Sequence, residues 1–296
     1  MKPIAECKCI QIEITNACNR DCANCHHLIG HQSNRYFMDL ATVVKAIDSL
    51  EGFPGNIGLM GGEPTMHPKF REICQIFQMK IPDRRRREFW TNGYKWDEYE
   101  DIIYETFDKD LIVYNDHSTP DGKHHPMLVA IQDVMDDEEE MWKLIDGCWK
   151  HDRWSAAITP KGCFFCEVAM ALDHALGGPG GYPIEKDWWK KDFKDQVRRY
   201  CKLCGATIPI GETSDNATYD LISMGNLEKL DKAGSPKVKA GNFAIYNRKW
   251  AKEQVKERLK GWKPYIFINF YASCPDDVRK AKIRNSKDYR NEDGKK

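Results

Sequence analysis

The chain has 296 residues, and its 45 lysines and arginines balance its 45 aspartates and glutamates. A neutral chain has no overall field that attracts nucleic acid or an anionic membrane, so we expect neither as a partner. No apolar run approaches the roughly 20 residues of a membrane-spanning helix, and the N-terminus lacks the apolar stretch of a secretory signal. We therefore expect a cytoplasmic protein, where cysteines stay reduced. The 12 cysteines then indicate metal binding.

The first 120 or so residues alternate between strand and helix patterns. Alternating or short continuous apolar runs predict strands at 9–15, 56–60, 87–91 and 111–115. Apolar stripes of helical period predict helices at 38–50, 70–79 and 96–107. This order predicts parallel βα units. Farther on, the pattern of residues 154–166 predicts a hairpin, and residues 177–181 predict a turn or linker. Both lie within a predicted second module, residues 145–215, that is rich in cysteine and tryptophan.

Cys18, Cys22 and Cys25 follow the first predicted strand with the spacing C-x3-C-x2-C. The spacing would also place three core thiols on one helix face, but the intervening residues favour a loop because they are poor helix formers: Asn16, Asn19, Asp21 and Asn24. A zinc site is a second alternative, completed by one of the nearby histidines His26, His27 and His31. A third is a cubane iron–sulfur cluster held at three corners, which leaves one iron open.

Two further motifs occur in order after the cysteines. Met60-Gly-Gly-Glu-Pro64 ends the second predicted strand, and Thr91-Asn-Gly93 ends the third. Together with the cysteine motif they resemble the radical S-adenosylmethionine (radical SAM) superfamily. The resemblance implies an α/β fold built as a partial (β/α)6 TIM-like barrel. It also implies a 4Fe–4S cluster whose open iron binds SAM, and reductive cleavage of SAM to a 5′-deoxyadenosyl radical that abstracts hydrogen from a substrate.

The resemblance also assigns roles to residues near the cysteines. The backbone at Gly61 and Gly62 would approach the ligand closely, and Glu63 would accept hydrogen bonds from the SAM ammonium group. Asn92 would orient the cofactor, and His26 takes the place where the family often has an aromatic residue against the adenine. Polar residues after the fourth strand would face the same cavity and contact SAM ribose or substrate, with a helix cap or turn as the alternative: Asn115, Asp116 and His117.

The second cysteine group contains two C-x2-C pairs, Cys163/Cys166 and Cys201/Cys204. Such pairs suit a zinc ribbon or a second 4Fe–4S cluster. With Cys148 and Gly162, they resemble the SPASM/twitch extension of radical SAM enzymes, which favours an auxiliary 4Fe–4S cluster over zinc. Five cysteines compete for four places, and the preferred set is Cys148, Cys166, Cys201 and Cys204. Cys163 or Cys274 would serve instead as a thiol that returns hydrogen to a substrate radical.

These observations divide the chain into a radical SAM core (1–145), a twitch-like cysteine-rich auxiliary domain (146–215) and a C-terminal extension (216–296) with a partly disordered tail. The expected function is hydrogen abstraction from a small polar metabolite, such as a sugar or nucleotide derivative, with flavodoxin or ferredoxin as electron donor. Whether the enzyme is an oxidoreductase, epimerase or lyase stays open. The alternatives are a peptide-modifying maturase or epimerase and, from another class, a non-catalytic zinc or iron–sulfur binding module.

Overall fold

The structure is a computed structural model that describes residues 1–115, 122–153 and 156–261. The strands are β1 (Cys9–Glu13), β2 (Asn56–Met60), β3 (Arg87–Thr91), β4 (Ile112–Tyr114), β5 (Lys123–His124), β6 (Ala156–Thr159), β7 (Gly162–Phe164), β8 (Thr213–Ser214), β9 (Asp220–Ser223) and β10 (Phe243–Tyr246). The α-helices are α1 (Leu40–Asp48), α2 (Phe70–Lys80), α3 (Trp96–Thr106), α4 (Ile131–Val134), α5 (Glu138–Asp146), α6 (Trp149–Arg153), α7 (Glu167–Leu176), α8 (Lys194–Tyr200), α9 (Met224–Lys232), α10 (Pro236–Lys239) and α11 (Lys252–Gly261).

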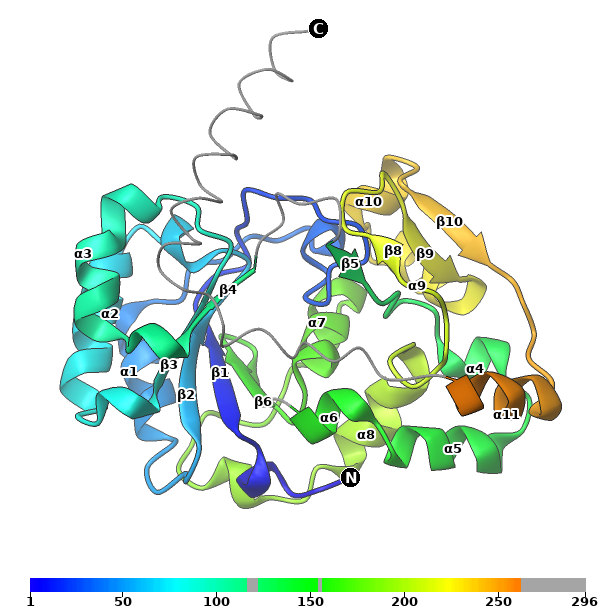
Figure 1. Cartoon of the computed structure of the whole chain (residues 1–296), viewed down its shortest axis with the longest axis horizontal. Coiled ribbons are helices and arrows are strands. Elements are labelled where there is room, and N and C mark those ends of the chain that lie inside the picture. Colours follow the sequence, from blue (N-terminus) through cyan, green and yellow to red (C-terminus); the bar gives the residue numbers. More distant parts are fainter. Residues whose placement is uncertain (116–121, 154–155, 262–296) are drawn as a thin grey trace, which may run out of the picture.

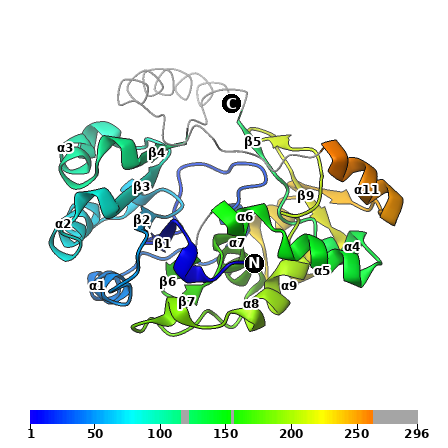
Figure 2. The ribbon, with the colours of Figure 1, turned by 60° about the horizontal axis from the view of Figure 1, so that its bottom comes forward.

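A mixed α/β fold is built around a six-stranded sheet with the order β4-β3-β2-β1-β6-β7. Strands β1 to β4 are parallel to one another, β6 pairs parallel with β1, and β7 pairs antiparallel with β6. The helices α1, α2 and α3 lie together on one side of β1 to β4 (Figures 1 and 2). The predicted hairpin forms as β6–β7, and β6 extends the central sheet because it pairs with β1.

The two faces of β1 differ in polarity. Ile10 and Ile12 are fully buried in the main apolar core, whereas Gln11 and Glu13 alternate with them and point to the opposite face, the inner face of the sheet. The register places Gln11 beside Gly58 of β2, and Gly58 beside Glu88 of β3. Strands buried on both faces of a parallel sheet are normally apolar throughout, so this buried polar row indicates a functional role.

The C-terminal half adds two small sheets, β9–β10 and β5–β8. The helix α7 lies between these elements and the central sheet, and nearly all of its residues are buried. Cys7, Cys9 and Cys74 are buried, as expected for isolated thiols. Within the described residues, every helix is too short or too polar to cross a membrane.

Candidate functional site

The cysteine loop, residues 14–28, follows β1 and docks on the turn after β2. The Gly62 N–H donates to the Thr15 carbonyl, and the Glu63 N–H donates to the Ala17 carbonyl, both at 2.8 Å. A Cβ on Gly61 would lie 2.6 Å from the Thr15 oxygen, and one on Gly62 would lie 2.6 Å from the Ala17 oxygen. The cysteine loop therefore packs so closely on Gly61 and Gly62 that neither position has room for a side chain. From the sequence alone, these glycines are expected to be needed for close approach to the ligand instead.

The Glu63 carboxylate is fully buried and connects the turns after β2 and β3. It accepts hydrogen bonds from the Thr65 N–H and hydroxyl groups, from the Thr91 hydroxyl, and from the Asn92 N–H at 2.7 Å. Burial raises the pKa of this carboxyl, against the opposing effect of these donors. The described contacts of Glu63 thus hold the Thr91-Asn92-Gly93 turn in place.

Cys18 is anchored through its sulfur. The Arg20 N–H donates to Cys18 Sγ at 3.4 Å, and the Asn92 side-chain amide lies 3.8 Å from the same sulfur. Asn92 also donates to Asn19 at 3.0 Å. Backbone and amide donors to sulfur are typical surroundings of iron–sulfur ligands, whose potentials they tune.

The three thiols of the loop influence one another electrostatically. Burial raises the pKa of Cys18 to about 12 and raises that of Cys22, and the neighbouring Cys25 adds to both shifts. Burial also raises the pKa of Cys25, so all three thiols hold their protons more tightly than usual in the metal-free protein, and metal binding would release them.

The histidines near the loop, which a zinc site would require as a fourth ligand, are engaged elsewhere. A zinc ion needs four ligands, with sulfurs about 2.3 Å from one point. In the part of the chain that the structure describes, no three His, Cys, Asp or Glu side chains lie in an arrangement that could hold a metal ion, and this applies to both cysteine groups and to either metal. The candidate histidines also have other contacts: His27 pairs with Glu13 at 2.6 Å, His31 pairs with Asp220 at 2.7 Å, and the His26 ring packs on that of His124 at 5.2 Å.

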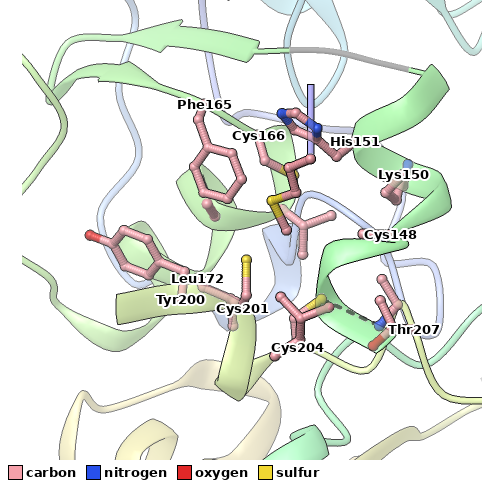
Figure 3. A pocket seen from close by; sticks show the side chains of 15 residues that line it. Cys148, Lys150, His151, Phe165, Cys166, Leu172, Tyr200, Cys201, Cys204 and Thr207 are labelled. Carbon is pink, nitrogen blue, oxygen red and sulfur yellow. Dashed lines mark hydrogen bonds between the residues drawn. The ribbon is translucent and has the colours of Figure 1, made fainter. Parts of the chain in front are cut away.

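A pocket in the second half of the chain brings together the four preferred cysteines of the second group: Cys148, Cys166, Cys201 and Cys204. They come from separate segments (Figure 3). Cys148 lies between α5 and α6, and Cys166 is the N-cap of α7. Cys201 begins the short helix Cys201–Leu203 after α8, and Cys204 is its C-cap.

Polar backbone groups point at these sulfurs. The Ala206 N–H donates to Cys204 Sγ at 3.4 Å. Burial raises the pKa of Cys148, and the backbone N–H groups of Lys150 and His151, at the start of α6, oppose that shift. Burial and the neighbouring Cys148 thiol raise the pKa of Cys204 to about 12. These four thiols line one pocket and have backbone donors beside them.

Cys163 does not line this pocket. Its thiol is fully buried and lies 3.8 Å from the Pro183 carbonyl. The second candidate hydrogen donor, Cys274, lies outside the described residues, as do Asp116 and His117. The Asn115 N–H donates to the Thr91 carbonyl at 2.9 Å, which places Asn115 directly after β4.

A buried cluster of charged groups connects the cysteine loop with the second pocket. Glu13 accepts hydrogen bonds from the Tyr36 hydroxyl at 2.5 Å and from His27 Nδ1 at 2.6 Å. His27 Nε2 lies 3.9 Å from Glu167, which forms a short ion pair with Lys150. Lys150 in turn lines the pocket of the four cysteines. Sequence reasoning missed this cluster, although a glutamate within the isoleucine-rich run of β1 was a visible signal.

Two polar groups of the inner face have no hydrogen-bond partner among the described residues. They are the whole Gln11 side-chain amide and Nε2 of His27. Gln11 is only 1% exposed. Buried polar atoms are nearly always hydrogen-bonded in proteins, so orphaned ones require an explanation such as a ligand.

Comparisons with known proteins give one family match. Residues 12–114 match the family model described as Radical SAM superfamily. No curated protein matches the chain. The crystal structure of BtrN in complex with AdoMet and 2-DOIA has 18% sequence identity and a TM-score of 0.43, covering 66% of this chain and 86% of that chain. A selenomethionine crystal structure of BtrN in an open conformation has 20% identity and a TM-score of 0.40, covering 68% and 86%.

Proposed function

We propose that the chain is a radical SAM enzyme, whose family model residues 12–114 match, and that Cys18, Cys22 and Cys25 hold its 4Fe–4S cluster. When bound, the cluster supplies the electron that cleaves SAM to methionine and a 5′-deoxyadenosyl radical, which abstracts hydrogen from the substrate. The observation that carries this proposal is the docking of the cysteine loop on Gly61 and Gly62, with Asn92 at the Cys18 sulfur. Three motifs from three adjacent parallel strands thereby converge on one place.

The residues around the loop have distinct tasks in this proposal. Glu63 fixes the turn that carries Asn92, through hydrogen bonds at both of its oxygens. Because these donors already engage the Glu63 carboxylate, we expect the SAM ammonium group to donate its hydrogen bonds to backbone carbonyl groups near Gly61. These residues follow the carboxyl ends of β1, β2 and β3 in the proposed partial (β/α)6 barrel. Ligands of such barrels bind at the carboxyl ends of the strands.

We propose that Cys148, Cys166, Cys201 and Cys204 hold an auxiliary 4Fe–4S cluster in a twitch-like domain. The support is the shared pocket and the backbone donors at Cys148 and Cys204. Zinc is the alternative at this site, because four thiolates suit both metals.

The polar inner face supports a small polar metabolite as the substrate. Gln11 offers both a donor and an acceptor that no described residue engages, which suits a ligand that carries hydroxyl groups. Three buried carboxylates, those of Glu13, Glu88 and Glu167, disfavour an anionic group at this face. A sugar-like substrate therefore fits better than a nucleotide. A reductant such as flavodoxin or ferredoxin would deliver the electron.

Anaerobic reconstitution with iron and sulfide tests the function. We expect a brown protein that converts SAM to 5′-deoxyadenosine in the presence of dithionite, detected by mass spectrometry, and a Cys22→Ala variant that does not. A colourless protein that retains zinc and leaves SAM intact would point to the non-catalytic metal-binding module instead.

A further inference from the structure

The Cys22–Cys25 turn is held by residues almost 200 positions further along the chain. The Ala23 N–H donates to the Asp215 carbonyl at 2.8 Å, and the Asn24 N–H donates to Asp220 Oδ1 at 2.6 Å. The Leu221 N–H donates back to the Asn24 side chain at 3.0 Å. Figure 1 shows β8, β9 and α10 beside the loop that follows β1. The shape of this turn therefore depends on the C-terminal elements as well as on the central sheet.

Lys237 of α10 contacts the turn directly. Its ammonium group donates to the Cys22 carbonyl at 2.9 Å and lies 3.2 Å from Asp220 Oδ1. The second oxygen of Asp220 pairs with His31 Nε2 at 2.7 Å, and the side chains of Asp220 and Lys237 are 1% and 6% exposed. Burying an ion pair is costly unless its hydrogen bonds are satisfied, and here the partners that satisfy it are groups of the cysteine loop and the short helix after it.

Gly30 provides the route by which Lys237 reaches the turn. A Cβ on Gly30 would lie 2.4 Å from Lys237 Cε and 2.4 Å from Asp21 Oδ1. The Lys237 side chain thus passes Gly30, in the short helix Ile29–His31 that follows the cysteine loop, where no side chain occupies the space. The atoms that approach Gly30 are the ends of flexible side chains, so an added methyl group would displace them without forcing the backbone to move.

We propose that Asp220 and Lys237 are positioning residues that preorganise Cys22 and Cys25 for iron, and we name the pair the distal clamp. Because linkage is reciprocal, iron bound by the loop also stabilises β9 and α10. This inference rests on the proposed function only in requiring that the loop binds iron. It does not depend on SAM cleavage, on the substrate or on the second pocket.

The first experiment compares Lys237→Met with Lys239→Met, an exposed lysine on the same short helix. Iron-loaded proteins are alkylated anaerobically with iodoacetamide, and the rate is read separately for each cysteine by peptide mass spectrometry. Loss of a residue that supports a metal ligand costs ~10- to 100-fold in metal affinity. We expect Cys22 and Cys25 to be alkylated faster by that factor in Lys237→Met, with Cys201 and Cys204 unchanged and Lys239→Met like the wild type. Unchanged rates at Cys22 and Cys25 would overturn the proposal.

Gly30→Ala tests the clamp while keeping every charge. Its methyl group takes the space of the Lys237 stem, so it should reproduce the faster alkylation of Cys22 and Cys25, and it should lower the melting temperature of the iron-free protein because Asp220 loses its buried partner. If Gly30→Ala leaves both rates at the wild-type value, Lys237 does not position the turn.

A third measurement uses the wild-type chain, so it does not depend on any clamp variant folding. Hydrogen exchange of residues 220–240 is measured with and without iron, and again in a Cys18→Ala/Cys22→Ala/Cys25→Ala variant. We expect iron to slow exchange of this segment in the wild type and not in the triple variant. Equal exchange with and without iron in the wild type would refute the clamp. Protection by iron without formation of 5′-deoxyadenosine would instead support the clamp and contradict the proposed function.

Discussion

His27 Nδ1 lies 2.6 Å from Glu13 Oε2, with both side chains buried between the two cysteine sites. Glu13 comes from β1, and His27 comes from the end of the cysteine loop. The hydrogen bond therefore links the inner face of the sheet to the segment that carries Cys25. A substitution at either residue should therefore change both the free energy of unfolding and the geometry of the cysteine loop.

We expect Glu13→Gln to lower the free energy of unfolding by about 1.5 to 3 kcal/mol, because a neutral amide replaces a charged acceptor of two buried hydrogen bonds. Urea denaturation of the iron-free protein measures this loss. Glu72→Gln, at an exposed position of α2, is the matched control and should change stability by less than about 0.5 kcal/mol. A Glu13→Gln variant as stable as this control would show that the Glu13 contacts contribute nothing.

The Gly62 position should tolerate no side chain. A Cβ there would lie 2.6 Å from the Ala17 carbonyl oxygen and 3.0 Å from Cys18 Cβ. Gly62→Ala must therefore displace the cysteine loop from the turn after β2. We expect iron at the first site to be bound about 10- to 100-fold more weakly, measured as faster alkylation of Cys18. Gly211→Ala is the control, because a Cβ at Gly211 meets no atom within 4 Å. Equal protection of Cys18 in the two variants would contradict the docking described for the loop.

Local patterns were enough to predict the first half of the fold. The strands β1 to β4 and the helices α1 to α3 form within two residues of their predicted bounds, because their apolar period follows from neighbours close in sequence. Glu13 was different. In the sequence it has the pattern of the exposed face of a half-buried strand, yet it is fully buried because α7 and the cysteine loop cover that face.

The contacts of the Cys22–Cys25 turn could not be predicted from sequence either. Lys237 and Cys22 are 215 residues apart, and Lys237 lies in a lysine-rich segment with no sign of burial. The preferred four cysteines of the second group do share a pocket. That choice came from a family resemblance, since spacing alone left five candidates for four places, and metal binding at this pocket stays a proposal.

Glu88 predicts a pH dependence of stability. Burial raises its pKa above the ordinary value, against hydrogen bonds from Asn56 and Trp90 that lower it. A raised pKa means that the folded state binds the proton more tightly. The stabilising contribution is therefore complete below the unfolded-state pKa of about 4.3 and is lost as the pH rises through the folded-state pKa.

We therefore expect Glu88→Gln to be more stable than the wild type at pH 8, by about 1.4 kcal/mol for each unit by which the Glu88 pKa is raised. The advantage should shrink as the pH falls and should be smallest near pH 4.5, close to the unfolded-state pKa of about 4.3. Urea denaturation of the iron-free proteins between pH 4.5 and 8 measures the difference. A constant difference across this range would mean that Glu88 does not titrate differently in the folded state.

The second pocket predicts opposite outcomes for two neighbouring cysteines. Cys166 lines the pocket with Cys201, whereas Cys163 is buried beside the Pro183 carbonyl. We expect Cys166→Ala to weaken or lose the second metal centre, because the variant removes one of the four proposed thiolate ligands. Cys163→Ala should keep the centre and lose only about 1 kcal/mol of stability from the small cavity. Iron, sulfide and zinc analysis of both reconstituted variants, with electron paramagnetic resonance after reduction, separates these outcomes. If Cys166→Ala keeps the second centre and Cys163→Ala loses it, Cys163 and not Cys166 is the ligand. If the wild-type protein binds zinc at this site and contains no sulfide there, the centre is a structural zinc ion and not a cluster.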